Sequence, residues 1–167
     1  MEKTISEAVA LRHSPLAYAQ QPVEQEKLEK VLHAAQWSAS AFNEQPWRFI
    51  IGEKGKGDSH EKVLLTLAEM NQLWAIHAPV LILAVYKTDF TQFPNPNKHG
   101  AYDTGQAMSA LALQAAAIDL HLHQMAGFSG EKARSMFNIP EGFEPIAVAA
   151  LGYKGSNADL PESLQAR

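Results

Sequence analysis

The clearest periodic pattern in this chain follows Pro22. Four apolar residues recur there at i, i+3, i+4 and i+7, the spacing that places side chains on one face of a helix: Leu28, Val31, Leu32 and Ala35. The charged residues between positions 24 and 30 fall mostly on the opposite face, where Glu and Lys side chains pair along a helix. The pattern predicts an amphipathic helix.

Three short apolar runs predict strands. Residues 47–51, 80–86 and 145–151 are rich in aliphatic and aromatic side chains and are bounded by Gly, Pro or polar residues. The run at 80–86 is apolar throughout, which is typical of a strand covered on both faces. We therefore expect it at the centre of a sheet.

Capping residues predict three further helices. Thr4, with Glu7 three residues later, can form a capping box for a first helix that ends near Arg12 to Pro15. Two later helices are predicted in the same way: Asp58 with Glu61 begins a helix that reaches Ala68, and Ser129 begins a short helix that reaches Phe137.

Residues 102–120 are rich in Ala and Leu and apolar almost all round, which predicts a helix buried on most of its surface. One small domain can hardly cover such a helix alone, so we expect a subunit interface to cover the rest. Helices alternate with strands in an α/β or α+β manner. The 167 residues fit a single domain, 1–167, in which residues 152–167 form a tail with little apolar periodicity.

Composition narrows the classes of function. The chain is 46% hydrophobic and 19% charged, which excludes disordered, collagen-like and coiled-coil proteins. Its net charge of -4 has the wrong sign for a general binder of nucleic acid or acidic membranes. The absence of Cys removes disulfides, thiolate nucleophiles and Cys-based metal sites. The longest apolar run, residues 78–86, is too short to span a bilayer, and no signal-peptide pattern opens the chain, so we expect a cytoplasmic protein.

Two glycine-containing segments resemble catalytic motifs without matching them. Gly52 and Gly57 have the spacing of a phosphate-binding loop, but Asp58 stands where that loop has Lys, so an exposed turn is the simpler interpretation. The segment around Ser129 is one residue too short for the nucleophile elbow of a serine hydrolase, and a helix cap explains this Ser.

Histidines and acidic residues give no catalytic pattern of their own. His121 and His123 would share a face in an extended segment, but no third ligand accompanies them, so we expect no metal site. The Glu residues between positions 24 and 29 are explained by pairing with Lys27 and Lys30 on a helix surface.

Three separated segments carry residues suited to a flat, phosphorylated ligand. Arg12, His13 and Ser14 offer a guanidinium, an imidazole and a hydroxyl, a good set for a phosphate monoester, although a solvated helix end has a similar composition. Residues 38–49 carry small hydroxyls and amides before a strand, which suit close approach to a flat polar ring, although a helix end and turn would use similar residues. Residues 125–128 could present backbone N–H groups to a ligand, or form a plain turn.

In combination, the motifs of the chain resemble the FMN-dependent nitroreductase family. The resemblance covers nearly the whole sequence and is carried by these residues: Arg12-His13-Ser14, Asn43-x-Gln45-Pro46-Trp47-x-Phe49, Asn71, Asp103-x-Gly105-x-Ala107 with Leu111 and Ala115, Gly127-Phe128, and Leu151-Gly152-Tyr153. The Asn-x-Gln-Pro-Trp segment is the most specific of them.

The resemblance implies a nitroreductase-like α+β fold, with a central, mostly antiparallel sheet flanked by helices. It also implies a homodimer with a long buried interface helix and two FMN sites between the subunits, with NADH or NADPH as electron donor. By position, the resemblance assigns the following residues to FMN: Arg12, His13 and Ser14 to the phosphate and ribityl chain, Ser40, Ala41, Phe42 and Asn43 from the partner subunit, Asn71 to the pyrimidine edge, and Met125, Ala126 and Gly127 to the region near N5.

The activity that the resemblance implies is a ping-pong NAD(P)H-dependent FMN oxidoreductase. A hydride would pass through flavin N5 to a small-molecule acceptor such as a nitroaromatic or a quinone. The flavin would carry this chemistry, which agrees with the lack of an evident acid, base or nucleophile. The alternative is a flavin-binding or interaction protein with little turnover on the same fold.

Three departures from the family pattern concern this site. Leu16 stands where many relatives have a basic residue, and Trp74 stands where some have Lys. The sequence also ends at Arg167, about where many relatives continue into a basic stretch. Either Arg167 substitutes for the missing charges, or the natural chain continues past Arg167, or the FMN site is weakened. For the chain as given we expect weak FMN binding, to which Arg167 contributes.

Overall fold

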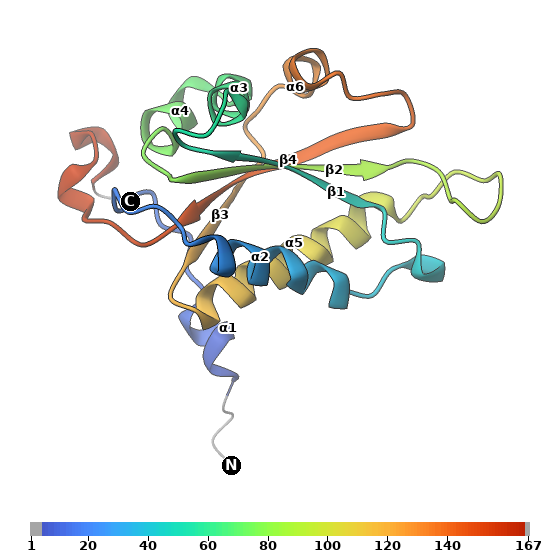
Figure 1. The fold of residues 1–167 in the computed structure, drawn as a ribbon, viewed down its shortest axis with the longest axis horizontal. Helices are drawn as coiled ribbons and strands as arrows, with labels where there is room; N and C mark the ends of the chain where they lie inside the picture. Colours follow the sequence, from blue (N-terminus) through green and yellow to red (C-terminus); the bar gives the residue numbers. More distant parts are fainter. Residues whose placement is uncertain (1–4, 166–167) are drawn as a thin grey trace.

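A computed structural model describes residues 5–165 as a four-stranded sheet between two layers of helices (Figure 1). The helices and strands have these bounds: α1 Glu7–Leu11, α2 Gln25–Ala34, β1 Trp47–Glu53, α3 Ser59–Thr66, α4 Glu69–Ala75, β2 Val80–Lys87, α5 Gly100–Ala117, β3 His121–Met125, α6 Gly130–Phe137 and β4 Phe143–Gly152. Short 3-10 turns precede β1 at Ala35–Trp37 and Ala41–Asn43, and two more follow β4.

The strands are ordered β1-β2-β4-β3, and each neighbouring pair is antiparallel. In the register, Phe49 of β1 lies opposite Ala84 of β2, which lies opposite Ala147 of β4. The run at 80–86 is confirmed as a central strand, and the runs at 47–51 and 145–151 also form strands. The predicted α+β fold with an antiparallel sheet is confirmed.

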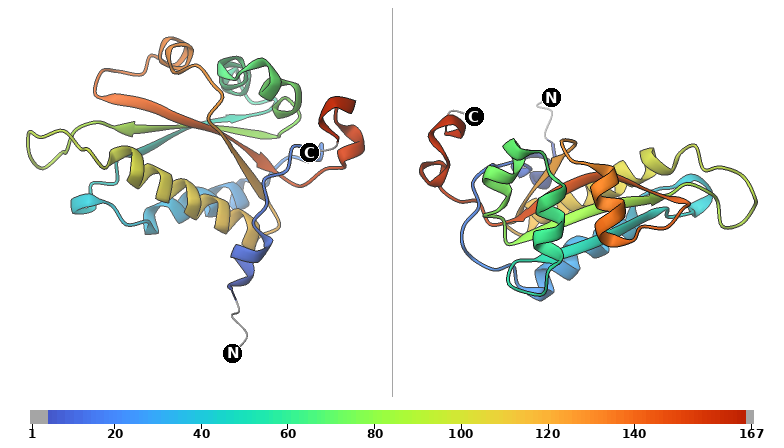
Figure 2. Two further views of the ribbon diagram at one scale, coloured as in Figure 1. Left: turned by 180° about the vertical axis from the view of Figure 1, so that it is seen from behind. Right: turned by 90° about the horizontal axis from the view of Figure 1, so that it is seen from above.

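Each face of the sheet is covered by its own set of helices. Helices α2 and α5 lie on one face, and α3, α4 and α6 lie on the other (Figures 1 and 2). Strand β2 contributes alternate residues to both: Leu81 and Leu83 pack in one hydrophobic cluster, and Val80 and Ile82 in the other. Two-sided burial explains why its sequence is continuously apolar.

The predicted helix beginning after Asp58 is interrupted. Helix α3 ends at Thr66, Leu67 and Ala68 are extended, and α4 begins at Glu69. The two extended residues at this break pair with the segment that follows β3. Leu67 forms a bridge with Phe128, and the Ala68 N–H donates to Gly127 O at 2.9 Å. Helix α4 and strand β3 are the two elements that the sequence patterns did not predict.

The predicted caps have different outcomes. Ser129 caps α6, with its Oγ accepting a hydrogen bond from the Lys132 N–H at 3.2 Å. Asp58 occupies the cap position of α3, as predicted, but its carboxylate pairs with Lys62 Nζ at 2.8 Å and makes no capping hydrogen bond to the helix backbone. Thr4 lies outside the described residues, and the described part of the first helix is preceded by Ser6.

Apolar surface remains on the side of the molecule that carries α1, α2 and α5. No residue of α1 is buried, and Val9 and Leu11 are about half exposed. On α5, Leu111 and Ala115 are buried against the sheet, whereas Tyr102 is 69% exposed. The sequence predicts that this helix is buried on most of its surface. Within one chain, α5 is buried only on the side that faces the sheet. Within residues 5–165, no helix has the length and apolar character that spanning a membrane requires.

Candidate functional site

A pocket of about 400 Å³ lies where the segment after α1 meets α4, β3 and the segment after β4. Its polar lining residues are His13, Ser14, Asn71, His123, Lys154 and Asn157. Three residues predicted from the sequence, His13, Ser14 and Asn71, are thus brought together. Leu16 and Trp74, which depart from the family pattern, line the same pocket.

The segment after α1 reaches this pocket because the core holds its following residues in place. Tyr18 is 4% exposed, and its hydroxyl donates to Ala150 O at 3.0 Å, an environment that raises its pKa chiefly by burial. The Ala19 N–H donates to Tyr153 O and the Gly155 N–H donates to Ala17 O, each at 2.9 Å. These bonds attach residues 17–19 to residues 153–155 as a short antiparallel pair.

Several basic groups surround His13. Partial burial lowers the pKa of His13, and the positive charges of Lys154 and Arg12 lower it further. His121, whose ring lies edge-on to that of His13 at 5.8 Å, also has a lowered pKa, first because of burial and then because of His13. Asp119 opposes the shift at His121. The cluster therefore creates a positive potential suited to an anion.

Arg12 lies beside the pocket rather than in its lining. Its Nη1 donates to Ser14 Oγ at 3.3 Å, and both side chains are exposed. The hydroxyl of Ser14, the imidazole of His13 and the ammonium of Lys154 form a donor set that matches a phosphate group. Lys154 was missed from the sequence because residues 152–167 were interpreted as a tail, although it lies only two positions beyond β4.

Asn71 and Gly127 are 56 positions apart in the sequence and in contact in the fold. The Asn71 Nδ2 donates to Gly127 O at 3.1 Å. A Cβ atom added at Gly127 would lie 2.8 Å from the same Nδ2, so only glycine allows this approach without a shift. Ala126 and Gly127 are exposed, whereas the side chain of Met125 is 4% exposed within the core, which leaves only its backbone to meet a ligand.

The other predicted segment, Ser40 to Asn43, lies at the opposite end of the sheet from this pocket (Figures 1 and 2). Its backbone is strained: Phe42, Asn43 and Gln45 have φ of 54°, 55° and 49°, a region that residues with a Cβ rarely adopt. A single chain thus separates Ser40, Ala41, Phe42 and Asn43 from the predicted phosphate-binding residues.

Two buried carboxylates hold the strained segment. Asp103 of α5 is 3% exposed, and its Oδ2 accepts the Ala41 N–H at 2.9 Å. The Glu44 carboxylate accepts the N–H and Oγ1–H of Thr91 at 2.8 and 2.6 Å and lies 3.5 Å from Lys87 Nζ. Burial favours the neutral form of Glu44, but these hydrogen bonds and the charge of Lys87 outweigh it, so its pKa is lowered. The charge of Glu44 is therefore stable only because of these contacts.

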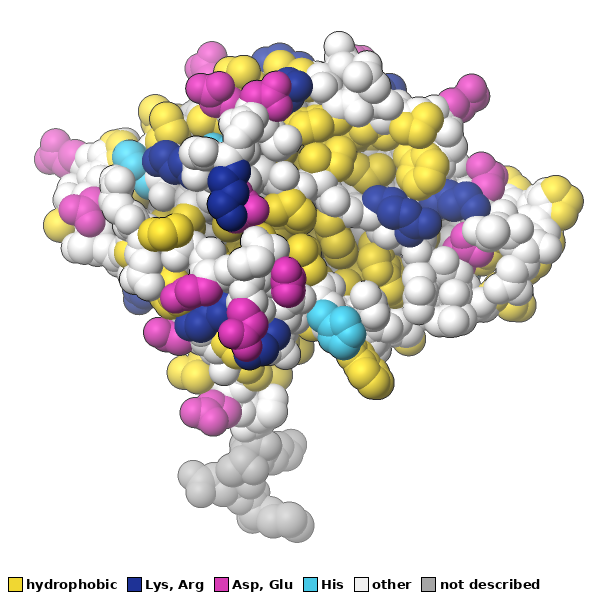
Figure 3. All heavy atoms as spheres, in the orientation of Figure 1, with side chains coloured by type: hydrophobic (Ala, Val, Ile, Leu, Met, Phe, Trp, Pro, Cys, Tyr) yellow, Lys and Arg dark blue, Asp and Glu magenta, His cyan; other side chains and the backbone are white. Residues whose placement is uncertain are grey.

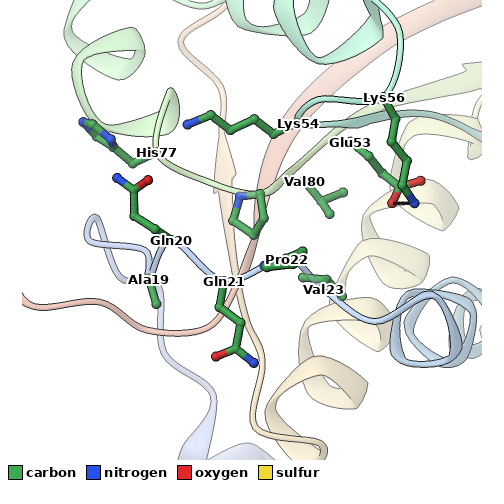
Figure 4. Close-up of a pocket in the computed structure, with 11 residues that line it drawn as sticks. Ala19, Gln20, Gln21, Pro22, Val23, Glu53, Lys54, Lys56, His77 and Val80 are labelled. Atoms are coloured by element: carbon green, nitrogen blue, oxygen red, sulfur yellow. Dashed lines mark hydrogen bonds and ion pairs between the residues drawn. The ribbon is translucent and has the colours of Figure 1, made fainter.

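A second pocket, of about 300 Å³, lies between residues 19–23 and the turn after β1 (Figure 4). Its basic groups already have partners: Lys56 pairs with Glu53 at 2.7 Å, and Lys54 donates to Ile76 O at 2.9 Å. The pocket around His13 has the less compensated charge and is the better candidate site. Within residues 5–165, no group of three His, Cys, Asp or Glu residues is placed to hold a metal ion.

Comparison with known proteins supports this fold. The model of the Nitroreductase family matches residues 9–64 and 53–153. A 15.4 kDa protein of Mycolicibacterium smegmatis is 32% identical over 126 residues, which are 72% of this chain and 84% of that protein. A protein of Xanthomonas oryzae pv. oryzae named "Putative NADH dehydrogenase/NAD(P)H nitroreductase" is 27% identical over 165 residues, which cover 88% of this chain and 83% of that protein.

Solved structures give the same result. A crystal structure described as an oxidoreductase containing FMN superposes with a TM-score of 0.92 and 32% identity, covering all of this chain and 85% of the other. A nitroreductase family protein from Clostridium difficile superposes with a TM-score of 0.74 and 25% identity, covering 96% and 95% of the two chains. The match of the family model over most of the sequence agrees with the resemblance carried by its motifs. The chain belongs to the nitroreductase family.

Proposed function

We propose that the chain is an NAD(P)H-dependent FMN oxidoreductase that acts on a small acceptor such as a nitroaromatic or a quinone. The observation that carries the proposal is the pocket in which His13, Ser14 and Lys154 meet Asn71. It combines donors for a phosphate with an amide suited to a polar ring. Membership of the nitroreductase family supports an oxidoreductase, and the FMN in a solved relative supports this cofactor.

The residues present fit FMN in two respects. Ser14, His13 and Lys154, with Arg12 alongside, would hold the phosphate by charge-assisted hydrogen bonds. In the same pocket, the Asn71 amide is oriented by its bond to Gly127 O and would meet the pyrimidine edge of the ring.

Ala126 and Gly127 would provide a close backbone surface for the flavin, because the exposed glycine carries no side chain there. When bound, FMN would supply the redox chemistry, the transfer of a hydride between the reduced nicotinamide and the acceptor. The protein would bind and orient the reactants and would need no nucleophile of its own.

We further propose a homodimer, in which the segment from Ser40 to Asn43 of each subunit completes the flavin site of the other. The exposed apolar residues on the side of α1, α2 and α5 support a partner there: Ile5, Val9, Leu11, Trp37, Phe42 and Tyr102. Apolar residues of the edge strand β1 are also only half-buried. Figure 3 shows hydrophobic side chains gathered over the sheet. Strain at Phe42 and Asn43 is typical of a ligand-binding segment.

The proposal is tested by adding FMN to the purified chain and then adding NADH or NADPH without oxygen. We expect saturable FMN binding and bleaching of the flavin absorbance by at least one of the two nucleotides. Flavin that binds but is not bleached by either nucleotide would instead indicate the flavin-binding protein with little turnover. A chain that binds no FMN would contradict both.

A further inference from the structure

We propose that Lys154 binds the phosphate of the flavin nucleotide and thereby sets the preference of this chain for FMN over riboflavin. The inference rests on the proposed function, because it concerns the same pocket. Leu16 stands where many relatives have a basic residue, and the sequence suggests Arg167, which lies outside the described residues, as a substitute. The inference assigns this positive charge to Lys154.

The backbone around Lys154 is fixed on both sides. Tyr153 O accepts the Ala19 N–H and the Gly155 N–H donates to Ala17 O, and Lys154 itself forms a bridge with Tyr18. A Cβ atom at Gly155 would lie 2.7 Å from the Tyr18 carbonyl carbon, so the two segments approach as closely as their backbones allow. Lys154 is therefore held opposite the segment that carries His13 and Ser14.

The side chain of Lys154 lies in the pocket lining together with the donors expected to hold a phosphate. Five other Lys and Arg side chains form ion pairs within residues 5–165, and Lys154 is not among them. Its charge instead adds to that of Arg12, and both charges lower the pKa of His13, an arrangement of like charges that is unfavourable until an anion neutralises it. A doubly ionised phosphate provides that neutralisation.

The pocket favours the phosphate of a flavin over a free anion. Leu16, Met70 and Trp74 line it with apolar surface, and Asn71 adds an amide. A ligand with a flat ring and a phosphate would use both parts. Riboflavin has the same ring and ribityl chain without the phosphate, so the ratio of the two affinities isolates the contribution of the phosphate.

The test compares FMN and riboflavin binding by quenching of flavin fluorescence in the wild type and three variants. Lys154→Ala is expected to weaken FMN binding by about ten- to a hundredfold, as for a lost hydrogen bond between charged groups, and to leave riboflavin binding within about twofold. Lys154→Arg keeps the charge and is expected to retain most of the preference. Lys132→Ala removes an exposed Lys of α6 that does not line the pocket, and serves as the matched control.

Salt provides a second measurement. The affinity of the wild type for FMN should fall as ionic strength rises, and this dependence should be smaller in Lys154→Ala, because one charge no longer faces the phosphate. Riboflavin binding should depend little on salt in all four proteins.

Each contrary outcome has a distinct meaning. If Lys154→Ala keeps the wild-type ratio of FMN to riboflavin affinity, the inference is wrong while the proposed function stands, because flavin is still bound. Equal binding of both flavins by the wild type overturns the inference in the same way. Loss of binding of both flavins in Lys154→Ala would show that this residue maintains the fold of the pocket and does not contact the phosphate. A wild type that binds neither flavin refutes the inference together with the proposed function.

Discussion

His60 is a polar residue enclosed by the core. It is 6% exposed, and its Nε2 lies 2.9 Å from Ala78 O. Burial lowers the pKa of His60, and the bond to Ala78 O opposes this shift without cancelling it. The neutral imidazole is therefore the form that the folded protein accommodates.

This lowered pKa predicts a dependence of stability on pH. Above about pH 6.5, His60 is neutral in both states and contributes no dependence. As the pH falls below 6.5, the unfolded chain takes up a proton that the folded chain does not, so the free energy of unfolding decreases until the pH passes the folded pKa. Urea unfolding at pH 7.5 and 5.5 should show a smaller decrease in His60→Gln than in the wild type. His99→Gln, at an exposed position, is the control, and equal decreases in both variants would contradict the prediction.

Asp103 acts at the residue scale on the strained segment before β1. Asp103→Ala removes the acceptor of the Ala41 N–H, and we expect it to lower the free energy of unfolding by about 1 to 3 kcal/mol. Because Phe42 and Asn43 keep a strained backbone only while their surroundings hold it, FMN binding should weaken as well. Urea unfolding and a flavin titration measure the two effects. Asp103→Asn, which retains an acceptor, should lose less of both, and a wild-type flavin affinity in Asp103→Ala would argue against the segment's role.

At the scale of elements, strands β1, β2 and β4 were predictable and the edge strand β3 was not. Strand β2 is buried on both faces, which forces a continuous apolar sequence that periodicity reveals. Strand β3 has five residues, of which only Leu122 and Met125 are buried, so its sequence carries too weak a pattern. Its position is set by pairing with β4, which no local feature of the sequence encodes.

The same reason limits prediction of the site. His13, Ser14 and Asn71 were assigned from motifs, and the fold places them in one pocket. Lys154 enters that pocket only because residues 17–19 pair with residues 153–155, a contact between the two ends of the chain. The assignments from motifs, including those of Ala126, Gly127 and Ser40 to Asn43, remain predictions about flavin binding.

The turn between β3 and α6 provides a test at the same scale. In Gly127→Ala, the new methyl group would lie 2.8 Å from Asn71 Nδ2 and would displace the amide, so we expect at least tenfold weaker FMN binding with little loss of stability. Gly130→Ala is the matched control, because nothing lies within 4 Å of its new methyl group and the residue is helical. Flavin titration and thermal unfolding distinguish the two variants. Unchanged FMN affinity in Gly127→Ala would remove the Asn71–Gly127 pair from the site.

At the scale of the whole molecule, the exposed apolar residues predict self-association. A dimer of the 18.3 kDa chain would cover α1 and the exposed side of α5, and stable interfaces of this kind usually exceed about 2,000 Å². Light scattering should therefore give twice the mass of the chain. Tyr102→Lys places a charge on the exposed side of α5 and should shift the equilibrium towards monomer with reduced flavin affinity. A monomeric wild type that binds FMN fully would exclude a site shared between subunits.

The central claim is that this chain binds FMN and passes electrons from a nicotinamide through it. The most direct measurement is the absorbance spectrum of FMN titrated with the purified protein, to which NADH or NADPH is then added under anaerobic conditions. The account predicts that the flavin spectrum changes saturably with protein and that the flavin absorbance disappears on addition of one of the two nucleotides, about an order of magnitude faster than with free FMN. A flavin spectrum that does not change at any protein concentration, together with no bleaching above that of free FMN, would contradict it.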